Sequence, residues 1–456
     1  MRTQVQDRIA GIYADGWSRI VATMIRFTGD WDLAEECAQD AFAQALQKWP
    51  KTGIPDQPLA WLTTTARNRA IDRIRRASTE AAKLREVAAM EPPSYPNDNE
   101  IPDERLELMF TCCHPALNLE AQVALVLRSL AGMSTAEIAR AFLVPERTMG
   151  QRLFRAKQKI AHAGIPFRVP PGHLLPDRLP AVLHVLYLLF NEGYGDPGKA
   201  GLAKEAIRLA RVLTGLMPDE PEALGMLALM LLHDARRPAR VDSAGDLVTL
   251  DDQDRSLWDQ AQIAEGTVLC ERALRRRRAG PFQLQAAIAA CHAIAPTAAE
   301  TDWPQIVGLY GELARIAPGP IVELNRAVAT GMVEGPDAAL ALVDPIVESG
   351  QLDGYYLLHA TRADLLRRAG REPESMASYR AALDLAPTDA ERRFLRRRLA
   401  TVAASEHGGP ARRISELAEQ SGDLIGVERG RIEAHADEMA GDLQAEDAVQ
   451  SGPEGE

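Results

Sequence analysis

The chain has 456 residues, which is too many for one ordinary domain, so two to four domains are expected. Aromatic residues make up 5% and charged residues 25% of the sequence, a composition typical of a mostly helical globular protein. The net charge of −12 would argue against nucleic-acid binding if it were evenly spread. It is not, because residues 404–456 hold thirteen acidic residues and four Lys or Arg. Local charge therefore decides what this chain binds.

The sequence lacks the motifs of several classes of protein and several kinds of site. No signal peptide opens the chain and no apolar run approaches the ~20 residues that span a bilayer, so we expect a cytoplasmic protein without membrane contact. The five cysteines are too scattered for a disulfide framework. Cys112, Cys113 and His114 could begin a zinc site, but no second cluster completes it, which favours buried thiols. Without a nucleophile elbow, a Walker-A loop or a complete metal pattern, we expect no enzyme, no metal and no cofactor.

Residues 10–77 form the first predicted module. Residues 32–49 have the periodicity of an amphipathic helix, with an inner stripe of Ala34, Ala38, Ala41, Phe42, Ala45 and Trp49 and an outer acidic face of Asp32, Glu36 and Asp40. A solvated acidic face is the ordinary interpretation. The same residues closely resemble region 2.2 of bacterial sigma factors of the sigma-70 family, which docks on RNA polymerase. The resemblance implies contacts with core polymerase by Asp32, Glu35, Glu36, Gln39, Asp40 and Phe42.

An arginine-rich segment follows at residues 58–76. Leu62, Ala66 and Ala70 share a helical face, although the amphipathic pattern is weak. The segment resembles sigma regions 2.3–2.4, which open and read the −10 promoter element. By that resemblance the loop 51–58 forms a pocket for a flipped base. The contacts that it implies with the −10 element are Trp61, Arg67, Asn68, Asp72, Arg75 and Arg76.

Residues 78–105 are predicted to be an extended linker. Four prolines and five acidic residues lie between positions 91 and 105, and prolines interrupt both helices and strands. In sigma factors the corresponding segment threads through the polymerase near the RNA path. An acidic spacer kept in solution is the alternative.

Residues 106–162 form the second predicted module, a helix-turn-helix. Residues 106–130 should build supporting helices, and Ser134 with Glu137 forms a capping box that begins the first helix of the motif. After Pro145, a second helix places Met149, Leu153, Ala156 and Ile160 on one stripe. The opposite face carries Arg147, Gln151, Arg155 and Gln158, flanked by Thr148, Arg152 and Lys159.

Arg, Gln and Thr on one helical face have the chemistry of a major-groove recognition helix, although a solvated basic face would look similar. The sequence VPERTMGQRLFRAK, residues 144–157, resembles sigma region 4.2, which reads the −35 element. The resemblance implies −35 contacts by Arg147, Thr148, Gln151, Arg152, Arg155 and Lys159.

The remaining residues read as successive amphipathic helices at 177–403 and an acidic tail at 404–456 that we expect to be disordered. Residues 355–399 resemble a tetratricopeptide repeat, with Gly370, Tyr379, Ala382 and Pro387 at its characteristic positions. Residues 199–233 and 320–349 resemble degenerate repeats, and a generic helical bundle fits them nearly as well. Such arrays present a concave face to partners.

Two motifs in this extension, residues 186–195 and residues 231–242, are unlike repeat sequence. The second places His233, Asp234, Arg236, Arg237, Arg240 and Asp242 close together. The cluster could be an anion pocket or an acid–base pair, but a buried ion-pair loop between helices is the more ordinary interpretation.

Three motifs in this order, covering about residues 10–160, resemble the extracytoplasmic-function group of the sigma-70 family, and the whole chain resembles its subgroup with a long tetratricopeptide-like extension. The resemblance implies an all-α protein that binds core RNA polymerase and promoter DNA, regulated through the extension and its protein or small-ligand partner. The short proline-containing connection at 162–176 favours an extension that supports the modules rather than inhibiting them. Two alternatives are a helix-turn-helix regulator without sigma activity and an enzyme built on the cluster at 236–242.

Overall fold

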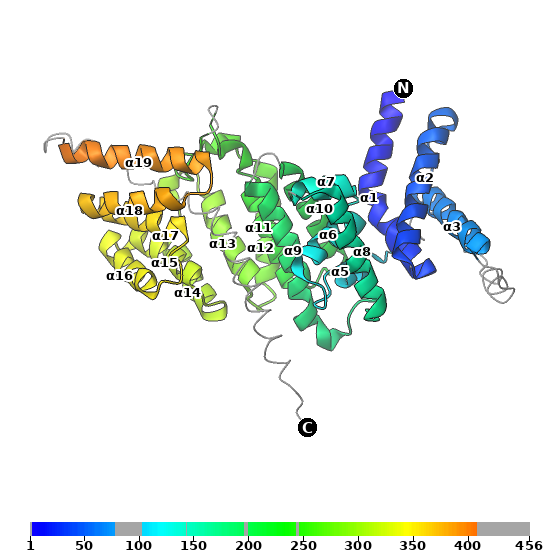
Figure 1. Ribbon diagram of the computed structural model, residues 1–456. Helices are drawn as coiled ribbons and strands as arrows, with labels where there is room; N and C mark the ends of the chain where they lie inside the picture. Colours follow the sequence, from blue (N-terminus) through cyan, green and yellow to red (C-terminus); the bar gives the residue numbers. More distant parts are fainter. Residues whose placement is uncertain (1, 78–102, 143, 196–198, 243–245, 408–456) are drawn as a thin grey trace. The chain divides into compact units, whose positions relative to one another are not determined.

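The computed structural model describes residues 2–77, 103–142, 144–195, 199–242 and 246–407 (Figure 1). Within these ranges the regular secondary structure is helical, apart from one antiparallel bridge between Val241 and Leu247, so the all-α prediction is confirmed. The chain packs as two units, residues 1–186 and 187–456. Most of the predicted linker and most of the predicted tail lie outside the described residues.

The first module consists of α1 (Arg2–Thr28), α2 (Trp31–Thr52) and α3 (Pro58–Ala77). The side chain of Asp30 begins α2 by accepting a hydrogen bond from the backbone N–H of Leu33 at 3.0 Å. All six residues of the predicted inner stripe of α2 are buried. Phe42 lies in an aromatic cluster with Tyr13 and Trp17, its ring centroid 4.8 Å from that of Tyr13. Leu62, Ala66 and Ala70 of α3 are fully buried, so the weak amphipathic pattern does mark the packed side of a helix.

The second module contains α5 (Arg105–Cys112), α6 (Leu119–Leu125), the π-helical turn η2 (Val126–Leu130), α7 (Thr135–Ala141) and α8 (Glu146–His162). The capping box is present, with reciprocal hydrogen bonds between Ser134 and Glu137. The buried residues of α8 are the predicted four, Met149, Leu153, Ala156 and Ile160. The predicted helix-turn-helix is therefore confirmed as a structure. Leu143, between α7 and α8, lies outside the described residues.

The boundary between the two units falls inside α9 (Leu175–Gly195). In the first unit, Arg178 of α9 donates a hydrogen bond to the backbone carbonyl of Phe110 at 3.1 Å. The second unit continues along the chain with α10 (Ala200–Leu216), α11 (Pro221–Asp234), α12 (Gln260–Leu274), α13 (Pro281–Ile294), α14 (Trp303–Ile316), α15 (Pro320–Val333), α16 (Pro336–Ser349), α17 (Tyr356–Arg368), α18 (Glu372–Leu385) and α19 (Asp389–His407).

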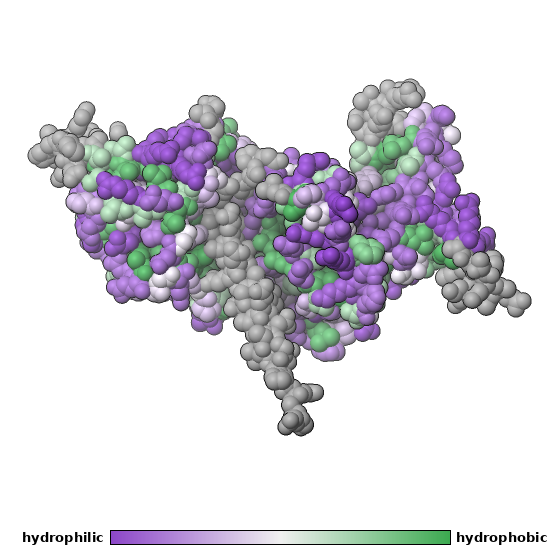
Figure 2. All heavy atoms as spheres, viewed as in Figure 1, coloured by the Kyte–Doolittle hydropathy of each residue, from purple (hydrophilic) through white to green (hydrophobic). Residues whose placement is uncertain are grey.

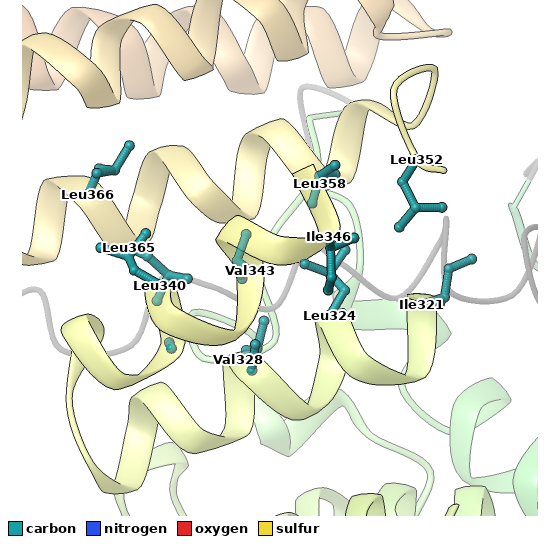
Figure 3. Close-up of a cluster of buried hydrophobic side chains, with 12 residues drawn as sticks. Ile321, Leu324, Val328, Leu340, Val343, Ile346, Leu352, Leu358, Leu365 and Leu366 are labelled. Carbon is teal, nitrogen blue, oxygen red and sulfur yellow. The ribbon is translucent and has the colours of Figure 1, made fainter. Parts of the chain in front are cut away.

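Consecutive helices pack on one another along the second unit from α13 to α19. The turn between α17 and α18 uses Gly370 at φ 73°, and that between α15 and α16 uses Gly335 at φ 96°, both in the left-handed region that favours glycine. Tyr379 and Ala382 of α18 are buried in one core with Leu395 of α19. Figure 3 shows how α15, α16 and α17 share the next core, which contains Leu324, Leu340, Val343, Leu358 and Leu365. Helix α17 contributes to both cores, with Leu365 in the second and Ala363 in the first.

Glu222 of α11 holds the start of α13. Its carboxylate accepts hydrogen bonds from the backbone N–H groups of Phe282 and Gln283, each at 3.1 Å, and from the side-chain amide of Gln283 at 3.0 Å. The two backbone N–H groups lie in the first turn of α13, where a helix offers them no carbonyl partner of its own. Burial raises the pKa of Glu222, and the three donors act against that rise.

The unusual motif after α11 is an ion-pair loop. Arg237 donates to Asp234 at 2.6 Å and to the backbone carbonyl of Gly193 at 3.0 Å. Arg240 donates to the carbonyl of Tyr194 at 2.8 Å, and its guanidinium lies 3.8 Å from the centroid of the Tyr194 ring. Arg236 is buried and lies 2.9 Å from the Nδ1 atom of His233. These contacts connect the end of α11 to the end of α9. They agree with the interpretation of the motif as an ion-pair loop between helices.

The visible surface in Figure 2 is largely hydrophilic, with small scattered hydrophobic areas. Among the described residues, no helix combines the length and the apolar character that crossing a bilayer would require.

Candidate functional site

The outer face of α8 is open to solvent. Arg147, Gln151, Arg155 and Lys159, all predicted DNA contacts, are exposed, and so is Gln158 beside them. Thr148 is half-buried at the edge of this face. Arg152 is also half-buried, because its guanidinium pairs with Glu120 of α6 at 2.9 Å. Most of the predicted −35 residues are therefore exposed on the outer face of α8, whereas Arg152 is bound by Glu120 of the same module.

Phe154 was missed by the sequence interpretation. It lies on the same outer face of α8, and 56% of its surface is exposed. A large apolar side chain among arginines and glutamines is an unusual surface residue, and an exposed ring can contact a thymine methyl group. Its position at i+3 from Gln151 could have revealed it, since the helical period places both residues on one side.

The predicted −10 residues lie along α3. Asn68, Asp72, Arg75 and Arg76 are exposed, whereas Arg67 is half-buried with its guanidinium 4.4 Å from the centroid of the Phe27 ring. Arg67 is thus held against α1 by a cation–π contact. Arg73, on the side of α3 that faces α2, pairs with Glu36 and Asp40.

An open pocket of about 620 Å³ lies between α2 and α3. The predicted loop contributes Pro55 and Gln57, and the predicted −10 residues Trp61, Asn68 and Asp72 line the rest together with Gln44, Lys48, Ala60, Thr64, Thr65 and Arg69. The Trp61 ring packs on Trp49, with centroids 5.3 Å apart, and Lys48 lies 5.8 Å from the centroid of Trp61. An aromatic wall with amide, hydroxyl and cationic groups around it suits a stacked, unpaired base.

The acidic face of α2 is partly exposed and partly occupied. Asp32, Glu36 and Gln39 are exposed and Asp40 is half-buried. Phe42 lies in the core of the first module, 4% exposed, so it can influence a partner only through the helix that it anchors. Glu35 is only 3% exposed, although its position next to Glu36 on the outer face would lead one to expect an exposed side chain.

Glu35 is buried because the second module covers it. Its carboxylate accepts hydrogen bonds from Arg128 Nε at 2.9 Å and Ser129 Oγ at 3.0 Å, both in η2. Lys157 Nζ of α8 lies 3.0 Å from Glu35 and 2.8 Å from Asp32. The two modules are therefore joined at the edge of α2.

Cys112, Cys113 and His114 do not converge as metal ligands. Both thiols are fully buried, and burial raises the pKa of Cys113 to about 12, so the thiols stay protonated. The Nδ1 atom of His114 accepts a hydrogen bond from the backbone N–H of Ala116 at 3.1 Å. Across the ranges that the structure describes, no three His, Cys, Asp or Glu side chains are grouped to hold a metal ion.

Three family models match separate parts of the chain. Residues 17–80 match Sigma-70 region 2, and residues 107–160 match Sigma-70, region 4. Residues 178–274 match a family of unknown function, DUF6596. The first two matches contain α2, α3 and all but the last two residues of α8, and the third contains the ion-pair loop.

Similar proteins fall into two classes. An uncharacterized protein of Rhizobium meliloti (strain 1021), R00370, is 44% identical over 396 residues, which are 84% of this chain and 93% of the relative. The ECF RNA polymerase sigma factor SigK of Mycobacterium sp. (strain KMS) is 38% identical over 95 residues, 19% of this chain and 47% of SigK. The probable ECF RNA polymerase sigma factor SigI of Mycobacterium tuberculosis (strain ATCC 25618 / H37Rv) is 26% identical over 159 residues, 34% of this chain and 54% of SigI. No solved structure matches significantly.

Proposed function

This chain belongs to the extracytoplasmic-function group of the sigma-70 family and carries a long C-terminal extension, and we propose that α2 binds core polymerase, α3 recognises the −10 element and α8 recognises the −35 element. A sigma factor lends promoter recognition and strand opening to core RNA polymerase, which makes the RNA. Its partners are accordingly core polymerase and promoter DNA, and we place the protein in the cytoplasm with them.

The observation that best supports this assignment is the two-sided character of α8. One stripe is fully packed against the module, while Arg147, Gln151 and Arg155 point away from it and are exposed. Arginine can grip guanine through two hydrogen bonds and glutamine can grip adenine in the same way, both from the major groove. We assign −35 recognition to these three residues, with Thr148, Arg152 and Lys159 contacting phosphates at the flanks.

The pocket between α2 and α3 is the candidate −10 site. A base that leaves the duplex loses stacking and pairing worth a few kcal/mol, and a ring such as Trp61 restores part of this by stacking. Asn68 and Asp72 on the same wall can hydrogen-bond the exposed edge of the base. Arg75 and Arg76, exposed farther along α3, can follow the phosphate backbone beyond the pocket.

The exposed acids of α2 are the candidate polymerase site. Asp32 and Glu36, which are exposed, and Asp40, which is half-buried, lie one helical turn apart and form a negative strip along the outer side of the helix. A strip of one sign steers and orients a partner surface of the opposite sign. We further propose that the extension regulates the two modules through a partner of its own.

Reconstituted transcription tests this function. Purified chain and core polymerase should together give a run-off transcript from a promoter selected by binding, and neither should do so alone. A helix-turn-helix regulator without sigma activity is the competing function. It would bind DNA without polymerase and would leave core polymerase inactive, so the two functions give opposite results.

A further inference from the structure

A small cavity lies among α17, α18 and α19, which Figure 1 draws in yellow and orange, and the segment 247–249. Its volume is about 60 Å³, whereas one water molecule needs only about 10–15 Å³. Apolar parts of its wall are formed by Leu247, Val248, Leu357, Phe394 and Leu395. The space therefore suits a small molecule with a short carbon chain.

Two polar side chains of α17 line this cavity, and each has an oxygen atom without a hydrogen-bond partner. Thr361 is 1% exposed and Asp364 is 4% exposed. Within the described part of the chain, neither Thr361 Oγ1 nor Asp364 Oδ2 has a partner. The two residues are three positions apart, so they are neighbours on one side of the helix. A buried oxygen atom without a partner costs stability, and a hydrogen-bond donor placed in the cavity would remove that cost.

The unpaired hydroxyl of Thr361 is unusual for a threonine in a helix. Such a hydroxyl often donates to the backbone carbonyl four residues earlier. Thr111 donates in this way to Glu107 at 2.7 Å, and Thr267 to Ile263 at 2.8 Å. Thr361 makes no such bond among the residues that the structure describes. Its oxygen is therefore available to a molecule in the cavity.

Asp364 is held in place through one of its two oxygens. Oδ1 accepts hydrogen bonds from Arg367 Nε at 3.1 Å and Nη2 at 2.8 Å, and this leaves Oδ2 as a fixed acceptor beside the cavity. Glu391 of α19 adds a second carboxylate to the wall, where it accepts from the hydroxyl of Tyr356 at 2.9 Å. Arg398 is the basic residue of this wall. Two carboxylates facing the same small space disfavour a ligand that carries negative charge.

We propose that this cavity binds a small primary amine with an apolar carbon skeleton. An ammonium group carries three N–H donors on one atom, so it can bond both Asp364 Oδ2 and Thr361 Oγ1. The bond to the carboxylate is charge-assisted and therefore stronger than one from a neutral donor. The carbon chain would lie against Leu357 and Leu395. An alcohol has one donor and a carboxylate has none, so neither completes both acceptors.

The wall of the cavity is bonded to the ion-pair loop. The backbone N–H of Val248 donates to the carbonyl of Arg240 at 2.9 Å, and the guanidinium of Arg240 donates to the carbonyl of Tyr194 at 2.8 Å. Asp246, next to the wall, accepts from Arg393 of α19 at 2.6 Å. A ligand against Val248 thus acts on both α19 and the loop after α11, and it would be the partner that the extension requires for regulation. Only this regulatory consequence rests on the proposed function, because binding is measured on the protein alone.

Calorimetric titration of the full-length chain tests the proposal, with n-butylamine as the probe. We expect saturable binding of one molecule per chain. Both n-butanol and butyrate should bind at least about tenfold more weakly at the same pH, because neither has an ammonium donor. A folded wild-type chain that does not bind n-butylamine at millimolar concentrations, or that binds n-butanol equally well, would overturn the inference. A chain that binds the probe but gives no transcript with core polymerase would reject the proposed function alone.

Thr361→Val tests the site, because it keeps the shape of the side chain and removes its oxygen. The affinity for n-butylamine should fall about three- to tenfold. The free protein should be at least as stable as the wild type, since an unpaired buried hydroxyl is removed. Thr267→Val is the matched control, because the hydroxyl of Thr267 is bonded within α12 and does not line the cavity. Unchanged affinity in Thr361→Val would overturn the inference.

Two further variants cover the carboxylate and the space. Asp364→Asn should weaken binding at least about tenfold, because the charge-assisted bond is lost. If loss of the pair with Arg367 prevents folding, Ala360→Leu fills the cavity from α17 without changing a polar group, and it should abolish binding. A folded Ala360→Leu variant that binds like the wild type would contradict the site.

A lysine side chain carries the same butylammonium group as the probe, so a lysine blocked at both ends identifies the source of the amine. Weaker binding of the blocked lysine than of n-butylamine would support a free small amine. Tighter binding of the blocked lysine would overturn the small ligand in favour of a lysine side chain of a partner protein.

Discussion

Arg73 of α3 donates a hydrogen bond to Asp40 of α2, with 3.0 Å between Nη2 and Oδ2, and it also pairs with Glu36. Arg73, which belongs to the same module as α2, therefore already pairs with two of the three acids in the strip of Asp32, Glu36 and Asp40. The side chains are 38% exposed for Arg73 and 41% for Asp40, so solvent screens the pair and it contributes little to stability. A basic partner surface can accordingly take the place of Arg73.

Reversing the charge of the strip should abolish assembly with polymerase. In the double variant Glu36→Lys and Asp40→Lys, two like charges would meet a basic partner, and the two pairs with Arg73 would be lost. The fold should survive, since exposed pairs of this kind are worth about 0–1 kcal/mol. Size-exclusion chromatography with core polymerase measures the complex. Gln47→Lys, exposed on the same helix, is the control for added positive charge, and normal binding by the folded double variant would contradict the α2 assignment.

Truncating the exposed arginines of α8 should weaken −35 recognition. If Arg147 and Arg155 read base edges, either change to Ala should cost about 1–3 kcal/mol on the cognate element and less on other sequences. If they contact phosphates, all sequences should weaken alike and the salt dependence of log K should become shallower by about one. Titration of labelled promoter DNA at several salt concentrations separates these cases. Glu146→Ala, exposed at the start of α8, is a control, and unaltered DNA binding in both arginine variants would argue against recognition by α8.

Removing the aromatic wall of the −10 pocket should impair strand opening more than polymerase binding. Trp61→Ala deletes the ring against which a flipped base could stack, a loss of about 1–3 kcal/mol. Fluorescence of 2-aminopurine at the flipped position reports opening, and co-elution with core polymerase reports assembly. Gln47→Ala, which does not line the pocket, should leave both unaltered. Equal loss of both signals with Trp61→Ala would mean that the ring only supports the fold.

The first unit should lose stability in mild acid because of His114. Burial and the nearby Arg178 lower the pKa of His114 to about 4, from an ordinary value of 6.5. A lowered pKa in the folded state means that the neutral ring stabilises the fold above pH 6.5, and that this contribution is lost as the pH falls from 6.5 through 4. We expect a loss of about 1–2 kcal/mol, reduced by solvent screening, in urea unfolding at pH 5 relative to pH 7.5. His114→Asn keeps an acceptor for Ala116 and should remove this part of the pH dependence.

The extension should be needed for transcription. A chain ending at Phe167 should transcribe poorly from its promoter, whereas one ending at Ala403 should behave like the full chain. The structure adds a control, because α9 belongs partly to the first unit and Arg178 bonds Phe110. A chain ending at Gly195 keeps α9. Activity regained by that chain would mean that α9 alone suffices, and a short chain that transcribes better than full length would show that the extension inhibits.

Local pattern predicted the helices of the two modules well. The buried stripe of α8, the capping box of α7 and the inner stripe of α2 follow from residues within a few turns of one another, where helical periodicity decides burial. Gly370 was likewise predicted from the local sequence to lie in a turn, and its φ of 73° explains why that turn needs glycine. The DNA and polymerase roles of individual residues stay predictions.

Burial of Glu35 could not be predicted in this way. Its partners Arg128, Ser129 and Lys157 are more than 90 positions away, and a glutamate beside an acidic face normally stays in water. The bonds from Arg237 and Arg240 to the end of α9 are non-local for the same reason, although the arginine-rich sequence indicated that something charged gathered there. Periodicity identifies which side of a helix is packed, but not which distant element packs on it.

Gly132, at φ 72° in the turn before α7, packs directly on the rings of Trp17 and Tyr13, and this has a consequence for how such chains can evolve. Its bare backbone fits against Trp17 and Tyr13 only because all three positions suit one another. A relative that replaces the glycine must therefore carry smaller residues at positions 13 and 17 or lose this packing. In an alignment of relatives, positions 13, 17 and 132 should covary, and lineages that have lost the glycine should carry smaller residues at 13 and 17.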